Sequence, residues 1–305
     1  LYPRTRPSLD GMSPRVRDWA ESGRTEEVGG YPIHVYTADR DSGPLICFLH
    51  GFPSSGFDWR HTFDRLPGRI EASVLAMDFI GFGLSGKPRQ ENSLLVQADV
   101  VEALVARHGT GGRPVYLVGH DMGTSVGLEL LARDIEGVLG FEVAGVLLFN
   151  GSMVQSAASP VLGQRLLRGR FGSLFTRLQN ERFFRNQFGS VFSSNHPLTD
   201  EEATDQWQLL NYDGGGSMGH LLISYMDERE RRADRWHGAI RDWDGDLRLA
   251  WGLEDPVATT NVLDAVLELR PDTPVTRLPG LGHYPQIEDP ERFCEVLVEA
   301  VDSSL

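Results

Sequence analysis

The stretch that decides the fold joins an apolar, β-rich run to a helical pattern through an aspartate framed by glycines. It reads Val115-Tyr116-Leu117-Val118-Gly119-His120-Asp121-Met122-Gly123. Glycines stand two positions before and two positions after Asp121, and a sharp turn from strand to helix needs small residues at those places. Such a turn pushes the intervening side chain out over the sheet edge. Aspartate is also a common helix N-cap, but strand, glycine frame and helix together favour a carboxylate nucleophile at Asp121.

On both sides of this turn, short apolar runs alternate with longer helical patterns. Six of the runs are expected to be buried strands: Leu45–His50, Ser73–Asp78, Val115–His120, Val143–Asn150, Leu247–Gly252 and Val275–Leu278. Helical periodicity predicts helices over four ranges: Leu94–His108, Met122–Glu136, Val262–Leu269 and Glu291–Val301. Two shorter runs, Glu26–Val28 and Ile33–Thr37, flank Gly29-Gly30 and predict an antiparallel hairpin at the sheet edge. The pattern predicts an α/β fold with a mostly parallel sheet flanked by helices.

The alternation stops between residues 151 and 241. That segment carries four helical patterns and no convincing strand: Leu162–Phe175, Phe183–Phe192, Glu201–Leu210 and His220–Arg235. We predict a helical cap inserted after the sixth strand, over the carboxyl edge of the sheet, where open α/β sheets bind ligands. Within it, the arginine-rich run 229–235 is interleaved with acidic residues and is expected to be a solvated helix face. The predicted organisation is a first core part at 1–150, the cap at 151–241 and a second core part at 242–305.

The composition is that of a globular enzyme. The chain has 305 residues, 40% of them hydrophobic and 24% charged, so it can bury a core without metal or disulfide staples. Its net charge of −14 disfavours nucleic-acid partners and anionic membranes. No run approaches the ~20 apolar residues of a membrane span, and the start lacks the apolar run of a signal peptide. Cys47 and Cys294 make neither a disulfide framework nor a zinc set, so we expect a cytoplasmic setting and no metal.

Three glycine-containing motifs imitate functional signatures. Residues 81–86 follow a predicted strand as a dinucleotide-binding loop would, but Lys87-Pro88 comes next where that loop needs a helix, so a tight turn is predicted. Residues 123–127 match the serine-hydrolase motif, but Ser125 would lie one turn inside the helix, so we expect a packing serine. Residues 213–216 are followed by no Gly-Lys-Ser/Thr of a phosphate loop and are expected to form a hinge in the cap.

The remaining motifs occur in the order and spacing of a known family. Besides the Asp121 turn, they are His50-Gly51-Phe52-Pro53, Asp78-Phe79-Ile80-Gly81-Phe82-Gly83-Leu84-Ser85-Gly86-Lys87-Pro88, Trp251-Gly252-Leu253-Glu254-Asp255-Pro256 and Gly282-His283-Tyr284-Pro285. From about Thr25 to Val301 the chain resembles the α/β-hydrolase superfamily, specifically its aspartate-nucleophile branch of epoxide hydrolases and haloalkane dehalogenases. Several stretches are also similar to the mesoderm-specific transcript relatives. The resemblance implies an α/β-hydrolase fold and a hydrolytic enzyme.

The resemblance assigns roles to residues that follow the predicted strands. Asp121 would attack carbon and form an alkyl–enzyme ester, and His283 would activate the water that hydrolyses this ester. Asp255 would hold the imidazole and stabilise its charged form, with the neighbouring Glu254 as a competitor for that role.

Phe52 and Met122 bear on both steps of such a reaction. Their backbone N–H groups would bind the oxyanion formed when the ester is hydrolysed. Haloalkane dehalogenases commonly place Asn or Glu at the first position and Trp at the second, where their side chains bind the departing halide. Both markers are missing here, which leaves cap residues such as Trp207 as candidate halide donors. Met122 also departs from the tryptophan common in epoxide hydrolases.

An opening epoxide needs a proton donor, and epoxide hydrolases use cap tyrosines for this purpose. Tyr225 lies in a segment similar to their second tyrosine segment, and Tyr212 is the candidate second donor, with His196 and His220 as alternatives. We therefore predict an epoxide hydrolase that uses water, and no cofactor, to open a small hydrophobic epoxide to a vicinal diol. Haloalkane dehalogenation by the same covalent mechanism is the alternative, followed by a non-catalytic hydrolase-like binding protein or an acyl hydrolase.

Overall fold

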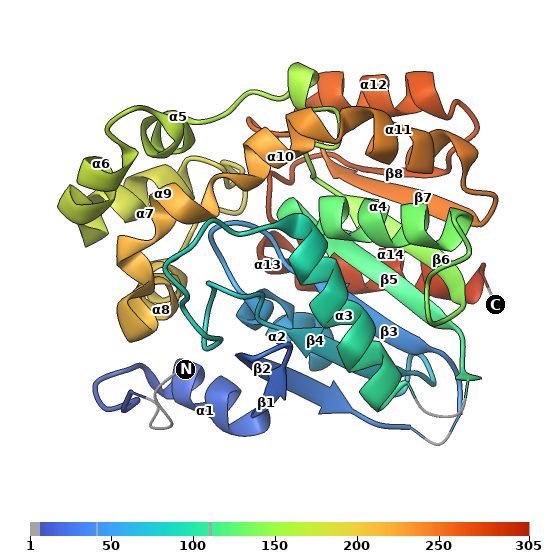
Figure 1. The fold of residues 1–305 in the computed structure, drawn as a ribbon, viewed down its shortest axis with the longest axis horizontal. Coiled ribbons are helices and arrows are strands. Elements are labelled where there is room, and N and C mark those ends of the chain that lie inside the picture. Colours follow the sequence, from blue (N-terminus) through green and yellow to red (C-terminus); the bar gives the residue numbers. More distant parts are fainter. Residues whose placement is uncertain (1–6, 41, 110–111, 305) are drawn as a thin grey trace.

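One eight-stranded sheet organises the computed structural model, which describes residues 7–40, 42–109 and 112–304. The strands are β1 (Arg24–Val28), β2 (Tyr31–Ala38), β3 (Leu45–Leu49), β4 (Ser73–Met77), β5 (Val115–His120), β6 (Val143–Phe149), β7 (Asp246–Gly252) and β8 (Val275–Leu278). Their order across the sheet is β1-β2-β4-β3-β5-β6-β7-β8. Strand β2 runs antiparallel to β1 and β4, and the other neighbouring pairs are parallel. The predicted α/β class with a mostly parallel sheet is confirmed (Figure 1).

The predicted hairpin at the sheet edge is present. Strands β1 and β2 pair with Val28 opposite Tyr31, which leaves Gly29 and Gly30 as a two-residue turn. Their φ angles are 58° and 85°, and a tight hairpin of matching twist requires positive φ at both positions. Glycine adopts this conformation without a steric cost, so the local sequence determines the turn.

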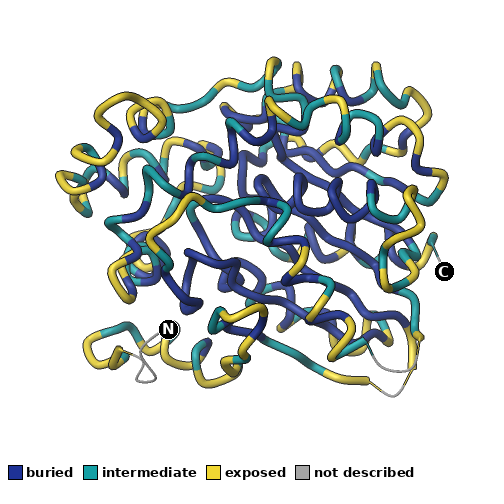
Figure 2. The backbone as a smooth tube through the Cα atoms, in the orientation of Figure 1, coloured by how far each residue is buried: buried dark blue, intermediate teal, exposed yellow. Residues whose placement is uncertain are grey.

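Helices cover both faces of the sheet, and consecutive residues of a strand alternate between two cores. In β3, Cys47 and Leu49 belong to one buried cluster, whereas Ile46 and Phe48 belong to the other. Burial on both faces is typical of parallel strands (Figure 2). The first cluster includes residues of α3 (Leu94–His108), α4 (Met122–Ile135), α11 (Ala233–Asp242) and α12 (Thr260–Leu269). The second includes residues of α1 (Pro14–Ser22), α2 (Arg60–Phe63) and α14 (Pro290–Asp302).

Among the described residues, the segment between β6 and β7 forms helices and turns without a strand. Its other helices are α5 (Leu162–Arg168), α6 (Gly172–Leu178), α7 (Glu181–Gly189), α8 (Asp200–Asn211), α9 (Gly219–Leu222) and α10 (Tyr225–Arg231). The predicted helix 162–175 is divided at Gly169, whose backbone is extended, and the predicted helix 220–235 is divided into three. Helices α5 to α9 gather at one end of the molecule, on the left in Figure 1. None of the described helices combines the length and apolarity that crossing a bilayer requires.

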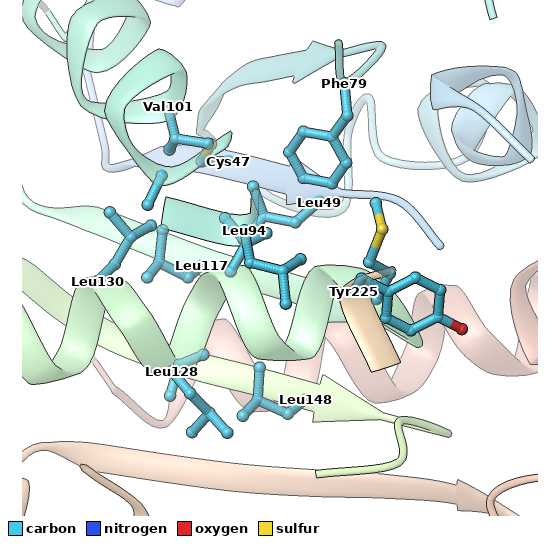
Figure 3. Close-up of a cluster of buried hydrophobic side chains, with 14 of the residues drawn as sticks. Cys47, Leu49, Phe79, Leu94, Val101, Leu117, Leu128, Leu130, Leu148 and Tyr225 are labelled. Carbon is cyan, nitrogen blue, oxygen red and sulfur yellow. The ribbon is translucent and has the colours of Figure 1, made fainter. Parts of the chain in front are cut away.

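A cluster of aliphatic side chains packs the Asp121 turn into the core. Leu117 of β5, Leu128 of α4 and Leu148 of β6 are fully buried there, together with Leu94 of α3. Figure 3 shows the ring of Tyr225, from the cap, beside this cluster with its hydroxyl directed away from the aliphatic side chains. The cap therefore shares a core with the sheet next to the candidate nucleophile.

Candidate active site

The candidate nucleophile Asp121 occupies the turn between β5 and α4 in a rare backbone conformation. Its φ of 45° and ψ of −107° lie in a region that residues other than glycine seldom adopt. Glycine is required around this turn, because neighbouring atoms lie too close to leave room for a Cβ. A Cβ at Gly123 would lie 2.2 Å from the carbonyl oxygen of Leu49, and one at Gly51 would lie 2.8 Å from Asp121 Cβ. The turn is strained and crowded, as a nucleophile elbow is.

The two oxygens of the buried Asp121 carboxylate have different surroundings. The backbone N–H of Phe52 donates a hydrogen bond of 2.9 Å to Oδ2. Within the described residues Oδ1 accepts no hydrogen bond, and it lies 3.6 Å from Nη2 of Arg229. Met122 begins α4, so its N–H lies at the positive end of the helix dipole next to Asp121. One carboxylate oxygen is therefore held, and the other is available to react.

His283 and Asp255 form a buried pair beyond the ends of β8 and β7. Nδ1 of His283 lies 2.7 Å from Oδ2 of Asp255. The backbone N–H groups of Val257 and Ala258 donate to Oδ1 of Asp255 at 2.7 and 3.1 Å, which fixes the carboxylate from its other side. Glu254, the competing acid, is exposed. The structure therefore brings Asp255, and not Glu254, to the imidazole.

Asn150 is a site residue that the sequence analysis missed. It follows β6 with a φ of 44°, and its Nδ2 donates a hydrogen bond of 2.8 Å to Oδ2 of Asp255. Its Oδ1 accepts a hydrogen bond of 2.9 Å from the backbone N–H of Gly252. Asn150 thus orients the carboxylate that orients the histidine. A signal existed, because Asn150 is the polar residue that ends the buried run 143–150 at the carboxyl edge of the sheet.

The charges around His283 set the protonation of its imidazole. Burial lowers the pKa of His283, but the negative charges of Asp255, Asp121 and Glu288 and the hydrogen bond to Asp255 raise it by more, so it lies above the usual 6.5. An imidazole of this kind accepts a proton readily and is stabilised once it is charged.

The predicted solvated face at residues 229–235 is wrong for Arg229, which is 3% exposed. Its Nη2 donates a hydrogen bond of 2.8 Å to the backbone oxygen of Asp121, and its Nε donates one of 2.7 Å to Oγ of Ser125. Its guanidinium carbon lies 4.7 Å from the centre of the Tyr225 ring. Helix α10 lies over the carboxyl end of β5, and the buried Asp121 carboxylate supplies the counter-charge that permits an arginine there. Ser125 lies one turn inside α4, as predicted.

Tyr225 lies in the same buried group. It is 1% exposed, and its ring centre lies 5.6 Å from that of Phe52. Burial and the Asp121 carboxylate raise the pKa of Tyr225 far above 10, although Arg229 and Gln164 oppose this. The phenol is therefore neutral and keeps its proton at physiological pH. The structure brings this candidate proton donor close to Asp121.

The candidate second donor, Tyr212, is placed elsewhere. Its ring belongs to the core cluster on the other face of the sheet, and its hydroxyl donates to the backbone oxygen of Pro7 at 3.3 Å. In the part of the chain that the structure describes, Trp207, His196 and His220 do not line the cavity next to His283, and neither do Tyr225 and Asp121. Of the cap donors considered from the sequence, only Tyr225 contacts the candidate nucleophile's surroundings.

An apolar cavity lies between the cap and the core. Phe52 and His283 line it on the core side, next to Tyr284. On the cap side, phenylalanine and glutamine side chains and one leucine line it, from α5, α6 and α7 and the end of α6: Gln164, Leu167, Phe175, Gln179, Phe183, Phe184, Gln187 and Phe188. A lining of this kind favours an uncharged, hydrophobic ligand.

A second buried carboxyl group supports the loop that carries the Phe52 amide. Ser54 Oγ donates to Oδ2 of Asp58 at 2.5 Å, and Nε2 of Gln206, from α8 of the cap, donates to Oδ1 at 2.8 Å. Burial raises the pKa of Asp58 to about 7, although both hydrogen bonds lower it. The hydroxyl of Tyr284 donates to the backbone oxygen of Phe52 at 3.3 Å. The loop is thus tied both to the cap and to the segment that carries His283.

Neither cysteine belongs to this site. Cys47 and Cys294 are buried and unpaired, and burial raises the pKa of both thiols. Across the described ranges of the chain, no group of three or more His, Cys, Asp or Glu side chains could hold a metal ion.

Known proteins share this architecture and much of the sequence. The model of the α/β hydrolase family matches residues 48–296. LipZ of Mycobacterium tuberculosis, whose name calls it a hydrolase, is 48% identical over 284 residues, which are 93% of this chain and 96% of LipZ. The mesoderm-specific transcript protein of Mus musculus is 30% identical over 302 residues, or 96% and 89% of the two chains. The solved haloalkane dehalogenase DatA of Agrobacterium tumefaciens has a TM-score of 0.76 at 24% identity, over 93% and 97% of the chains.

These matches establish the family. The chain belongs to the α/β hydrolase family, as the sequence motifs indicated, and it is a hydrolase of that family. The similarity to DatA shows a shared fold. The names of the two relatives do not state on which bond they act.

Proposed function

We propose that the protein hydrolyses its substrate through a covalent ester on Asp121. The observation that carries this proposal is the asymmetric carboxylate: the Phe52 N–H holds Oδ2, whereas Oδ1 accepts no hydrogen bond from the residues that the structure describes. Oδ1 attacks carbon, and the leaving group departs with the electron pair of the broken bond. His283, supported by Asp255, then takes a proton from water, and the resulting hydroxide attacks the carboxyl carbon of the ester.

The N–H groups of Phe52 and Met122 stabilise the oxyanion of this second step. Phe52 already donates to Oδ2, so no donor has to move when negative charge develops on that oxygen. Collapse of the intermediate expels the alkoxide, which takes the proton of the His283 imidazolium and leaves as the alcohol. The Asp121 carboxyl group then releases its hydroxyl proton to solvent, which restores the carboxylate. The atoms of one water molecule are thereby added to the substrate.

We propose an epoxide as the substrate, with Tyr225 as the proton donor. As Oδ1 of Asp121 forms its bond to carbon, the carbon–oxygen bond of the epoxide breaks and the oxygen takes the phenolic proton. The nearby Arg229 cation, 4.7 Å from the ring centre, stabilises the phenolate that remains until it is reprotonated from solvent. Hydrolysis of the ester then yields a vicinal diol. The apolar cavity supports a small hydrophobic epoxide over a polar one.

Haloalkane dehalogenation is the second candidate, and Arg229 is the observation that favours it. A departing halide needs N–H donors near the attacking oxygen, and Nη2 of Arg229 lies 3.6 Å from Oδ1 of Asp121. This guanidinium takes the place of the side-chain donors that Phe52 and Met122 do not provide. Dehalogenation gives the neutral phenol of Tyr225 no necessary role, and we therefore rank dehalogenation second.

One experiment separates these reactions. In the His283→Ala variant, attack by Asp121 survives and water activation fails, so the covalent ester accumulates and its mass can be measured on the intact protein. An epoxide adds its whole mass, because its oxygen stays on the adduct, whereas a haloalkane adds its mass less hydrogen halide. We expect whole-mass adducts from an epoxide panel, located by peptide mass spectrometry on the peptide that contains Asp121.

The matched control is the double variant Asp121→Ala/His283→Ala, which should form no adduct. Halide-loss adducts alone would replace the epoxide proposal with dehalogenation. If small and bulky members of both panels leave the protein unmodified, the covalent proposal fails and an acyl hydrolase or a binding protein remains.

A further inference from the structure

The outer face of the cap carries a concentration of exposed apolar side chains. Among the described residues, seven large hydrophobic side chains are exposed, and five of them lie on or between α5 and α6. These five are Leu162 (57% exposed), Leu166 (39%), Phe171 (70%), Leu174 (54%) and Leu178 (69%). We call them, with the arginines described next, the cap patch. Single exposed leucines are ordinary, but five within seventeen consecutive residues form a surface that water solvates poorly.

Arginines lie between these apolar residues. Arg165, Arg168, Arg170 and Arg177 are exposed on the same two helices and the turn between them, and residues 162–178 contain no acidic residue. Arg168 is compensated by Asp227 and Glu230 of α10, with which it forms ion pairs. The patch is thus positively charged, although the whole chain carries −14. Charges are screened beyond about 8 Å at physiological salt, so the arginines of the patch, and not the distant acidic residues, set the charge that a surface bound there meets.

The same two helices form one wall of the active-site cavity. In α5, Leu162 and Leu166 point outward while Gly163 and Leu167 are buried, and in α6 Phe175 lies next to the exposed Leu174. Gly163, Leu167 and Phe175 line the cavity that His283 also lines. Both helices lie at the far end of the cap from the sheet (Figure 1), and their outer surfaces are exposed (Figure 2). Only the helices α5 and α6 would therefore separate a surface bound to the cap patch from the cavity.

We propose that the cap patch docks the protein on an anionic lipid bilayer. The leucines and Phe171 enter the boundary between headgroups and acyl chains, and the arginines pair with lipid phosphates, as in helices that lie in a membrane interface. A second copy of the chain fits less well, because a symmetric contact would bring the arginines of both copies together. The net charge of −14 does not prevent this docking, because the acidic excess of the chain lies outside residues 162–178. Docking itself does not depend on the proposed function; delivery of a membrane-dissolved substrate to the cavity does.

Vesicle sedimentation tests the proposal with the intact protein. We expect the wild type to sediment with phosphatidylcholine vesicles that contain phosphatidylserine, and roughly ten-fold less with phosphatidylcholine alone, with binding weakened by added salt. Phe171→Ser should lower binding to the anionic vesicles roughly ten-fold, and Arg170→Glu/Arg177→Glu should do the same. Phe171→Trp should retain it, because tryptophan partitions well into the interface.

The matched control is Val138→Ser, since Val138 is 65% exposed after α4, away from the cap patch. It should bind like the wild type, and so should Asp121→Ala, which separates docking from catalysis. The proposal is overturned if the wild type ignores anionic vesicles, or if Phe171→Ser binds as the wild type does. It is also overturned if light scattering shows a dimer that Phe171→Ser abolishes while vesicles bind neither protein, because the patch would then be a contact between copies.

Discussion

Nε of Arg229 donates a hydrogen bond of 2.7 Å to Oγ of Ser125, and both side chains are buried. Ser125 is the serine of the segment Gly123-Thr124-Ser125-Val126-Gly127, which imitates a serine-hydrolase motif. Its hydroxyl does not lie at the turn between strand and helix. Instead it fixes an arginine of the cap beside Asp121, so that the serine positions the positive charge that the candidate nucleophile needs.

Replacement of Arg229 tests the importance of that charge. In Arg229→Met the buried carboxylate of Asp121 loses its counter-charge, and breaking a buried ion pair typically costs about 3–5 kcal/mol. We expect kcat/KM to fall by about 100-fold or more, measured with the substrate found by adduct formation. The control Arg231→Met removes an exposed arginine of the same helix and should have little effect. Near-normal turnover in Arg229→Met would show that Asp121 needs no cation beside it.

Two substitutions distinguish the positioning serine from the nucleophile. Ser125→Ala leaves Nε of Arg229 without its acceptor, and hydrogen bonds to charged groups contribute about 1.5–3 kcal/mol, so we expect a loss of roughly 10- to 100-fold in kcat/KM. Asp121→Ala should abolish turnover entirely. Steady-state kinetics on both folded variants provide the comparison. If Ser125→Ala were as inactive as Asp121→Ala and formed no ester in the His283→Ala background, Ser125 would have to be the nucleophile.

Tyr225→Phe tests proton donation. The substitution keeps the ring against Phe52 and Arg229 and removes only the phenolic hydroxyl, with the proton that it would donate. We expect alkylation of Asp121 by an epoxide to slow by about 10²–10⁴-fold, the usual contribution of one general acid, with ester hydrolysis changed much less. Tyr212→Phe is the matched control, because the Tyr212 hydroxyl bonds to Pro7 and should not affect either step. Rapid-quench single turnovers measure the two steps, and equal alkylation rates in both variants would leave Tyr225 a packing role.

The pH dependence of ester hydrolysis should report the environment of His283. Burial lowers the pKa of His283 and Asp255 raises it, with the net effect a raised pKa in the free enzyme. The imidazole is a base only when neutral, so hydrolysis should rise with pH through the pKa that His283 has in the ester, where the Asp121 charge is gone and Asp255 and Glu288 still raise the pKa. In Asp255→Asn the raising influence is lost while burial remains, so the profile should move to lower pH as the maximal rate falls. An unchanged midpoint in single-turnover profiles would contradict the assigned pair.

Asp58 should make stability depend on pH. Its pKa is raised from 3.8 to about 7 in the folded protein, mainly by burial. The folded state therefore keeps a proton that the unfolded state releases, and this contribution to the free energy of unfolding is lost as pH rises toward the folded pKa. Asp58→Asn removes this contribution. Between pH 3.8 and about 7, the free energy of unfolding of the variant should therefore rise, relative to that of the wild type, by up to about 1.4 kcal/mol per pH unit. Urea unfolding of both proteins at several pH values measures this difference, and a constant difference would show that Asp58 is already ionised.

The sequence by itself determined the features that depend on neighbouring residues. The glycines around Asp121 predict the strained turn because a side chain at Gly123 would collide with Leu49, and Gly29-Gly30 predicts the hairpin because both positions need positive φ. The alternation of buried runs and helical patterns predicts the sheet, because parallel strands that are buried on both faces need nearly continuous apolar runs. Residues that follow strands also gather at one edge, and the resemblance paired Asp255 with His283 there, where Nδ1 of His283 lies 2.7 Å from Oδ2 of Asp255.

Only the tertiary structure decided which residues of the cap reach that edge. Arg229 and Ser125 are 104 positions apart in the sequence. An arginine among acidic neighbours has the local pattern of a solvated helix, so nothing in the run 229–235 distinguishes the buried Arg229 from the arginines beside it. Its burial depends on the path of α10 over the end of β5 and on the charge of Asp121 there. Tyr212 was the candidate second donor beside Tyr225, but it packs in a different buried cluster and its hydroxyl bonds to Pro7. The physical reason is that a cap residue's partner is chosen by how helices pack, which short-range sequence patterns do not encode.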